Sequence, residues 1–203
     1  LVVMSATLDG ARVARLLDDA PVVVSEGRLH PVTERYLGRR REAPLEQDMA
    51  DAILSALAAE RGSVLCFLPG AREIERTRER LEGRVGAAVE IHTLYGALDA
   101  RAQDAAIAPA PAGARKVVLA TSIAETSLTI EGVRVVIDSG LSRRPRYEPG
   151  AGLTRLETVR ESRASAEQRK GRAGRIEPGA CWRLWDEPET RALAPFDRPE
   201  IMD

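Results

Sequence analysis

Three arginines lie close together between glycines in the segment Gln168–Arg175, which reads QRKGRAGR. If the chain is helical from Ser165 onward, Gln168, Arg172 and Arg175 share one helix face, because residues three and four apart lie together. Guanidinium groups are permanently charged and fork-shaped, which suits them to phosphate oxygens. The small residues between the arginines would let a second surface approach closely. The pattern indicates arginine fingers for a nucleotide held by another domain; the alternative, a solvated basic helix face, is disfavoured by the two glycines.

The composition is that of a soluble globular protein with an aliphatic core. Of the 203 residues, 44% are hydrophobic, 30% are charged and only 3% are aromatic. The net charge of −1 does not by itself indicate a nucleic-acid partner. The stretch from Ser139 to Arg175, however, holds nine Arg and one Lys against four Glu, a net charge of +6. Such a basic block attracts phosphate groups.

Cysteine and histidine usage limits the possible classes of protein. Cys66 and Cys181 lie inside apolar runs and are expected to be buried free thiols of a reducing compartment, the cytoplasm. With only His30 and His92 besides, no metal-ligand cluster of known spacing can be assembled. No apolar run reaches membrane-spanning length, and there is no basic-then-apolar leader. Because the chain lacks an initiator Met, we expect an interior piece of a longer protein.

Strands that alternate with helices predict an α/β fold with a mostly parallel sheet. Strands are expected at 21–25, 32–37, 63–68, 89–94, 116–120, 133–138 and 180–185. Helices are expected at 8–17, 45–59, 71–81 and 99–107, with a helical turn at 123–128 and the arginine helix from Ser165 through Arg175. Residues 145–161 predict a β-hairpin around Pro149-Gly150.

Ligands of an open α/β sheet bind at the carboxyl ends of its strands. The loops expected there each carry a glycine or a hydroxyl, and they lie at residues 69–72, 95–96, 121–122 and 139–140. Small residues with accessible backbone N–H groups suit a nucleic-acid backbone. The alternative for any single loop is ordinary turn chemistry, but four together beside a basic block favour a functional interpretation.

Several segments, in this order, resemble motifs of the DEAH-box RNA helicases of superfamily 2. Ser5-Ala6-Thr7 resembles motif III, Thr121–Ile130 (TSIAETSLTI) motif V and Gln168–Arg175 motif VI. Phe67–Gly70 resembles motif IV and Leu94–Leu98 motif IVa. The resemblance covers nearly the whole chain, and the sequences of the motif segments are most similar to those of the bacterial HrpB-type branch.

The resemblance implies a RecA-like fold with a β-hairpin insertion. Residues 1–26 would end a first RecA-like domain, residues 27–190 would form the second, and residues 191–203 would lead into a winged-helix domain. The chain has neither a Walker A loop nor a DEAH tetrad. The groups that hold the phosphates and Mg²⁺ would therefore lie mainly in the first domain, and this chain alone is expected not to hydrolyse ATP.

The resemblance also assigns roles around ATP. Arg172 and Arg175 would stabilise charge on the γ-phosphate, and Gln168 would orient the attacking water. Ser127 would sense the γ-phosphate. Thr129 and Glu131 would contact the sugar or base side of the nucleotide, with Glu131 standing where many relatives carry Asp.

On the RNA side, Thr121, Ser122 and Gly96 would hold phosphates through hydroxyl and backbone N–H groups, with Arg72 a weaker candidate. Such contacts are independent of base sequence and weaken with salt. The hairpin would sit where a duplex is split; the alternative is a decorative insertion. Ser5 and Thr7 would couple ATP to strand separation, or simply cap the helix at 8–17.

Two further residue types were open to interpretation. Lys170 is expected to point to solvent. Trp182 and Trp185 could stack on bases, although core packing of at least one is favoured.

The expected function is one half of an ATP-driven RNA helicase that acts with the first RecA-like domain and the winged-helix domain of the same protein. The RNA would be single-stranded or a duplex with an overhang, and no membrane partner is expected. The alternatives are a non-catalytic RecA-like module that binds RNA or nucleotide, and a DNA translocase of the same superfamily.

Overall fold

Six parallel strands form the sheet at the centre of the computed structural model, which describes residues 10–23, 30–40, 42–125, 129–148 and 152–197. The strand order is β1-β8-β5-β2-β4-β3, and β6 and β7 form a separate antiparallel pair. The strands are β1 (Val32–Tyr36), β2 (Ser63–Phe67), β3 (Val89–Leu94), β4 (Arg115–Ala120), β5 (Val133–Asp138), β6 (Leu141–Glu148), β7 (Leu153–Arg160) and β8 (Gly179–Arg183). The predicted α/β fold, a mostly parallel sheet with a β-hairpin insertion, is confirmed.

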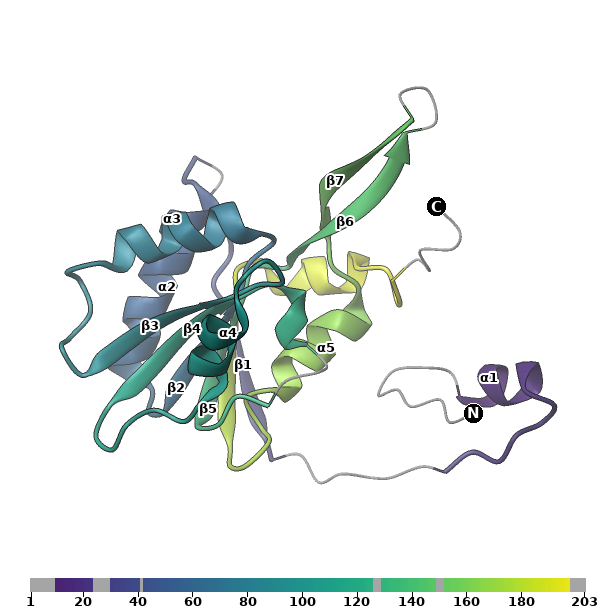
Figure 1. Ribbon diagram of the computed structural model, residues 1–203, viewed down its shortest axis with the longest axis horizontal. Coiled ribbons are helices and arrows are strands. Elements are labelled where there is room, and N and C mark those ends of the chain that lie inside the picture. The colour runs from purple at the N-terminus through teal and green to yellow at the C-terminus, as the bar shows by residue number, and fades with distance from the viewer. Residues whose placement is uncertain (1–9, 24–29, 41, 126–128, 149–151, 198–203) are drawn as a thin grey trace.

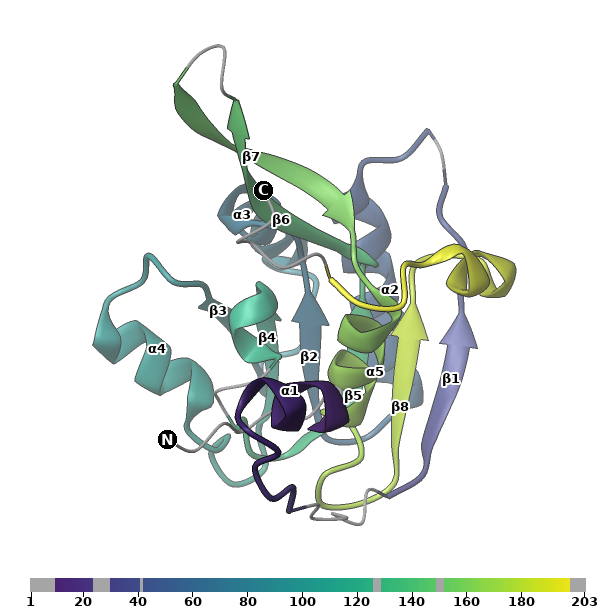
Figure 2. The same cartoon turned by 90° about the vertical axis from the view of Figure 1, so that its right-hand side faces the viewer.

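Helices cover both faces of the sheet (Figures 1 and 2). The α-helices are α1 (Gly10–Leu16), α2 (Leu45–Ala59), α3 (Ala71–Leu81), α4 (Ala100–Ile107) and α5 (Arg163–Gly171), and the 3-10 helices are η1 (Ser122–Ala124) and η2 (Glu187–Ala192). No helix within the described ranges has the length and apolar character needed to cross a membrane.

The central strands are buried on both faces, so that each strand contributes to two cores. In β2, Val64 and Cys66 pack with the residues of α2 and α3. Leu65 and Phe67, which alternate with them, pack on the other face with residues of α4 and η1. This is why the strand is a continuous apolar run. Both cysteines are free and buried, and burial raises their thiol pKa, which leaves them unreactive.

Two expected elements differ from the structure. Residues 21–23 form no strand, and residues 24 and 25 lie outside the described part of the chain. The arginine helix α5 ends at Gly171, so Arg175 is not helical. Glycines at 171 and 174 account for this early end, because glycine disfavours helix interiors. Helix α1 lies apart from the sheet (Figure 1), and the predicted domain boundaries stay predictions.

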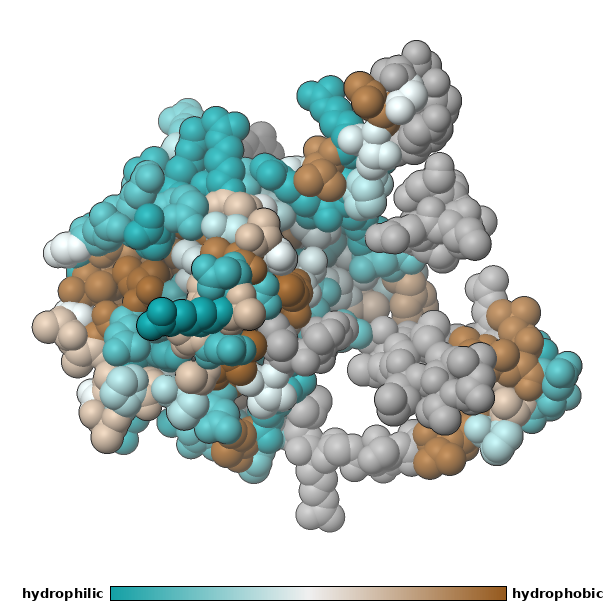
Figure 3. Space-filling model, viewed as in Figure 1, coloured by the Kyte–Doolittle hydropathy of each residue, from teal (hydrophilic) through white to brown (hydrophobic). Residues whose placement is uncertain are grey.

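The hairpin of β6 and β7 projects beyond the carboxyl end of the sheet (Figures 1 and 2). Its base is fixed by ion pairs: Arg143 Nη2 lies 3.0 Å from Glu73 Oε1 of α3, and Arg144 pairs with Asp197. Farther out, Leu153 and Leu156 are 68% and 62% exposed, and Figure 3 shows apolar and polar groups side by side on this arm.

Candidate functional site

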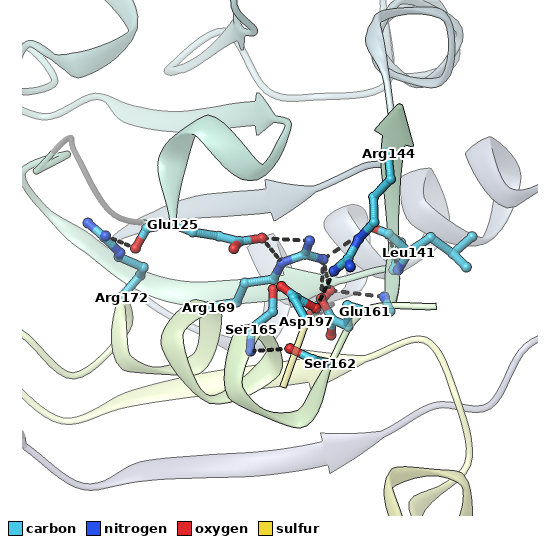
Figure 4. A network of polar contacts seen from close by, with 12 residues as sticks. Glu125, Leu141, Arg144, Glu161, Ser162, Ser165, Arg169, Arg172 and Asp197 are labelled. Atoms are coloured by element: carbon cyan, nitrogen blue, oxygen red, sulfur yellow. Dashed lines mark hydrogen bonds and ion pairs between the residues drawn. The ribbon is translucent and has the colours of Figure 1, made fainter. Parts of the chain in front are cut away.

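Residues 172–175, which we term the arginine turn, follow directly on α5. Arg172 is the C-cap of the helix and is only 6% exposed. Its Nη2 donates to the backbone carbonyl of Glu125 (Figure 4). Arg175 is exposed, and its Nη1 donates to Thr129 Oγ1 at 2.7 Å. The two arginines therefore contact the two ends of segment 125–129, which contains Ser127.

The two guanidinium groups of the arginine turn repel each other. Burial, and next the charge of Arg175, lower the pKa of Arg172 to about 10. The turn therefore concentrates positive charge at one place. An anion bound beside Arg175 would relieve this repulsion, because an opposite charge favours the ionised form of each group.

The small residues of the arginine turn serve packing within this chain. A Cβ added at Gly174 would lie 2.5 Å from the carbonyl oxygen of His30 and 2.8 Å from Val32 Cγ2. The N–H of His30 donates to the Gly174 carbonyl at 2.8 Å. A second surface thus approaches Gly174 closely, as predicted, and it is the chain's own entry into β1.

The other predicted nucleotide residues are placed only in part. Gln168 is half-buried on α5, one turn before Arg172. Glu131 is exposed and lies close to Thr129 in the chain. Three predicted residues, Ser5, Thr7 and Ser127, lie outside the described residues.

Three of the four predicted RNA loops lie next to one another, because β2, β4 and β3 are neighbours in the sheet. Gly96, Ser122 and Arg72 are exposed there, and Thr121 is half-buried. The N–H of Thr121 donates to the Leu94 carbonyl at 3.1 Å, which joins two of these loops. The carboxyl edge thus presents glycine, hydroxyl and guanidinium groups together.

The fourth loop, Ser139-Gly140, is buried, so its predicted accessibility to a nucleic acid is wrong. Gly140 adopts a φ of 72°, and a Cβ there would lie 2.8 Å from a ring atom of Trp185. Its N–H donates to Asp138 Oδ1 at 2.9 Å. These contacts anchor the start of the hairpin on the sheet.

A buried charge centre, formed by Arg169 with Glu125, Asp138 and Glu161, lies between the arginine turn and the hairpin base (Figure 4). Nε and Nη2 of Arg169 each lie 2.7 Å from Glu125 Oε1. Its Nη1 lies 2.8 Å from Asp138 Oδ1 and 2.5 Å from Glu161 Oε2, and donates to the Leu141 carbonyl at 3.2 Å. Spacing alone does not distinguish Arg169 from Arg172, and this centre was missed.

The charge centre contains three carboxyl groups for one guanidinium. Burial would lower the pKa of Arg169, but Asp138, Glu161 and Glu125 together raise it. Burial, and next the charge of Asp138, raise the pKa of Glu161 well above its ordinary value. A proton on Glu161 lets that side chain donate to Asp138, which reduces the excess of negative charge.

Lys170 and the two tryptophans contact the protein itself. Nζ of Lys170 lies 3.1 Å from Glu34 Oε1 of β1, so the expectation that it points to solvent is wrong. Trp182 and Trp185 are both buried, and stacking on bases is not supported. Arg183, also unforeseen, packs over the Trp185 ring at 5.3 Å from its centroid.

Among the described residues, no group of His, Cys, Asp or Glu side chains could hold a metal ion. The three carboxyl groups of the charge centre surround Arg169 instead.

Comparisons with known proteins agree with this geometry. The family described as helicase conserved C-terminal domain matches residues 47–177. The chain is 50% identical to the ATP-dependent RNA helicase HrpB of Escherichia coli over 202 residues, covering 100% of the chain and 25% of that protein. It is 39% identical to the probable ATP-dependent RNA helicase DHX34 of Mus musculus, covering 99% of the chain and 19% of that protein. The chain therefore spans about a quarter or less of the length of these relatives.

Solved structures give the same result. The crystal structure of the Escherichia coli DEAH/RHA helicase HrpB superposes with a TM-score of 0.92 at 50% identity, over 98% of this chain and 25% of that one. A second structure, the E. coli DExH-box NTPase HrpB, gives a TM-score of 0.90 at the same identity, over 98% of this chain and 24% of that one. The resemblance found in the sequence motifs is confirmed.

Proposed function

The chain belongs to the helicase conserved C-terminal domain family, and from this we propose that it is the second RecA-like half of an ATP-dependent RNA helicase. In this proposal ATP binds between this domain and the preceding RecA-like domain of the same protein. The sheet and its helices then serve as a rigid frame that carries an arginine turn on one face and an RNA-binding edge at the carboxyl ends of the strands.

The exposed Arg175 beside Arg172 is the observation that carries the proposal. Arg175 has a hydroxyl partner in Thr129, and its exposed fork can reach an anion outside the domain. Charge on the transferring phosphoryl group and on the leaving oxygen would be stabilised by such a fork. Arg172, which is buried, donates to the carbonyl of Glu125, two positions before Ser127 in the chain. Gln168, one turn earlier, would orient the attacking water.

Nucleotide recognition on this side would include Thr129 and Glu131, and Ser127 would sense the γ-phosphate. The donor set of the described residues contains no metal cluster, so Mg²⁺ is assigned mainly to groups of the preceding domain. Bound there, it would neutralise charge on the phosphates. Ser5 and Thr7 would transmit the state of ATP to the RNA.

RNA would lie across the carboxyl edge of the sheet. Thr121, Ser122 and Gly96 would contact its phosphates, with Arg72 adding positive charge. The exposure of Gly96, Ser122 and Arg72 on neighbouring loops supports this placement. The hairpin beyond this edge would separate the strands of a duplex that has an overhang.

The test uses Arg175→Ala in the full-length protein. We expect RNA-stimulated ATP hydrolysis to fall by about 10³-fold, in the range known for arginine fingers, while ATP binding is largely retained. The matched control is Arg101→Ala, which removes another exposed arginine, on α4, and should leave hydrolysis unchanged.

Two results would contradict the proposal. ATP hydrolysis at the wild-type rate in Arg175→Ala would contradict the proposed catalytic role of Arg175. Binding of RNA or nucleotide by the wild-type protein without turnover would instead favour a non-catalytic module, and stimulation by DNA equal to that by RNA would favour a DNA translocase.

A further inference from the structure

Glu125 connects two parts of the molecule that the proposed function treats separately. It is the C-cap of η1 and lies three positions after Ser122, one of the predicted RNA-binding residues. Its backbone carbonyl accepts from Arg172, and its carboxylate oxygen Oε1 accepts from Arg169. Glu125 therefore contacts both Arg169 of α5 and Arg172 at the C-cap of that helix (Figure 4).

The turn that leads to Glu125 is short and internally bonded. The N–H of Ala124 donates to the Thr121 carbonyl at 3.2 Å, and the N–H of Glu125 donates to the Ser122 carbonyl at 2.9 Å. Because the turn is hydrogen-bonded within itself, a displacement of Thr121 or Ser122 would also displace Glu125.

On its other side, Glu125 meets an anchored partner. Arg169 is 1% exposed, pairs with Asp138 and Glu161, and lies with Cζ 4.9 Å from the centroid of the Phe67 ring. Because the guanidinium is fixed by the sheet and by the hairpin base, the Glu125 carboxylate cannot move without breaking this contact or moving α5.

Charge balance indicates that Glu125 is not required to neutralise Arg169. Asp138 and Glu161 already supply two carboxyl groups to the single guanidinium. The Glu125 carboxylate, which is 12% exposed, still loses part of its hydration on contact with a cation that already has two partners. Glu125 lies between the RNA-side turn and the arginine turn, and we take this position to be the reason why a carboxylate is found there.

We propose that Glu125 is a positioning residue that couples the RNA-binding loop to the arginine turn. This inference rests on the proposed function. RNA on Thr121 and Ser122 would set the position of the Glu125 turn, and the carbonyl of Glu125 would set that of Arg172 beside Arg175. RNA binding would thereby align the arginine turn for hydrolysis.

The experiment compares Glu125→Gln with Glu161→Gln in the full-length protein, using poly(U) as the RNA probe. Both variants replace a carboxyl group that contacts the same guanidinium with an amide. Glu161 lies at the hairpin base, and its raised pKa makes its substitution the smaller change in charge. For Glu125→Gln we expect the ratio of hydrolysis with RNA to hydrolysis without RNA to fall by about tenfold, a typical coupling between sites. The poly(U) concentration for half-maximal stimulation should stay within about twofold of wild type. Glu161→Gln should keep the wild-type ratio.

Each other outcome overturns the inference. A wild-type ratio in Glu125→Gln would remove the coupling role, and an equal loss in Glu161→Gln would mean a general disturbance of Arg169. A Tm of Glu125→Gln that falls far below that of Glu161→Gln would show a purely structural role. If the wild-type protein itself lacks RNA-stimulated hydrolysis, the proposed function fails and the inference fails with it; failure of the inference alone leaves wild-type stimulation intact.

Discussion

The charge centre around Arg169 and the arginine turn at 172–175 are adjacent in the chain but lie in opposite environments. Arg169 is 1% exposed and is surrounded by carboxyl groups, which raise its pKa. Arg175 is exposed and bonds a hydroxyl. The first arginine is committed to interactions within the domain, whereas the second can meet an external anion.

The arginines of the QRKGRAGR segment therefore differ in role: Arg169 binds carboxyl groups within the domain, and Arg175 is accessible from outside it. A guanidinium buried among carboxylates has little left to offer a phosphate, because its donors are already used. An exposed guanidinium contributes little to stability but keeps its donors accessible. Arg172 lies between the two cases, since it is buried and its Nη2 donates to the backbone carbonyl of Glu125.

The largest effect that separates the two regions is expected from Arg169→Ala. Removing the guanidinium leaves the buried Asp138 and Glu161, and the half-buried Glu125, without their cation, which costs about 3–5 kcal/mol of unfolding free energy. Arg175→Ala should change the unfolding free energy by less than about 0.5 kcal/mol. Denaturant unfolding of the two variants measures these changes. Equal losses of unfolding free energy would contradict the difference between the two regions.

A smaller effect is expected from Gly174→Ala within the arginine turn. The added Cβ would meet the His30 carbonyl and Val32, so the turn must shift, at a cost of about 1–3 kcal/mol. Gly96→Ala is the matched control, because a Cβ there meets nothing within 4 Å. Thermal unfolding of both variants tests this, and an unaltered Gly174→Ala would mean that the turn adapts freely.

The smallest effect concerns the pH dependence of the charge centre. Burial and Asp138 raise the folded-state pKa of Glu161, and Arg169 and Glu125 also face it. Its contribution to stability is therefore fully present below the ordinary pKa of about 4.3 and is lost as pH rises through the folded-state pKa.

Glu161→Gln should remove this loss of stability with rising pH. Relative to wild type, the variant should lose less unfolding free energy as the pH rises from 5 to 8. Denaturant unfolding at the two pH values measures the difference. Parallel pH profiles for both proteins would mean that Glu161 carries no proton in the folded state.

Much of the fold could be predicted because its signals are local. The predicted ranges 45–59, 71–81, 89–94 and 133–138 coincide with the bounds of α2, α3, β3 and β5. Apolar spacing reports which faces of these segments are buried. The strand expected at 21–25 was not found over its described residues, since a short β-branched run does not specify a pairing partner.

The candidate site could be predicted in part. The motifs identified the segments, and the parallel sheet brings Gly96, Thr121, Ser122 and Arg72 to one edge. The burial of Ser139-Gly140 and the contact of Lys170 with Glu34 could not be foreseen. Both depend on packing between segments that are distant in the chain, as in the pair of Lys170 with Glu34, which are separated by 136 positions.

By itself, the sequence determined the alternation of apolar strands and amphipathic helices, and with it the parallel sheet and the order of the motifs. Only the tertiary structure decided which arginine of the QRKGRAGR segment is buried and which is exposed. The physical reason is that burial of a charge requires partners, and Glu125 and Asp138 reach Arg169 from 44 and 31 positions away. No local pattern encodes that meeting, because folding of the whole sheet brings these groups together.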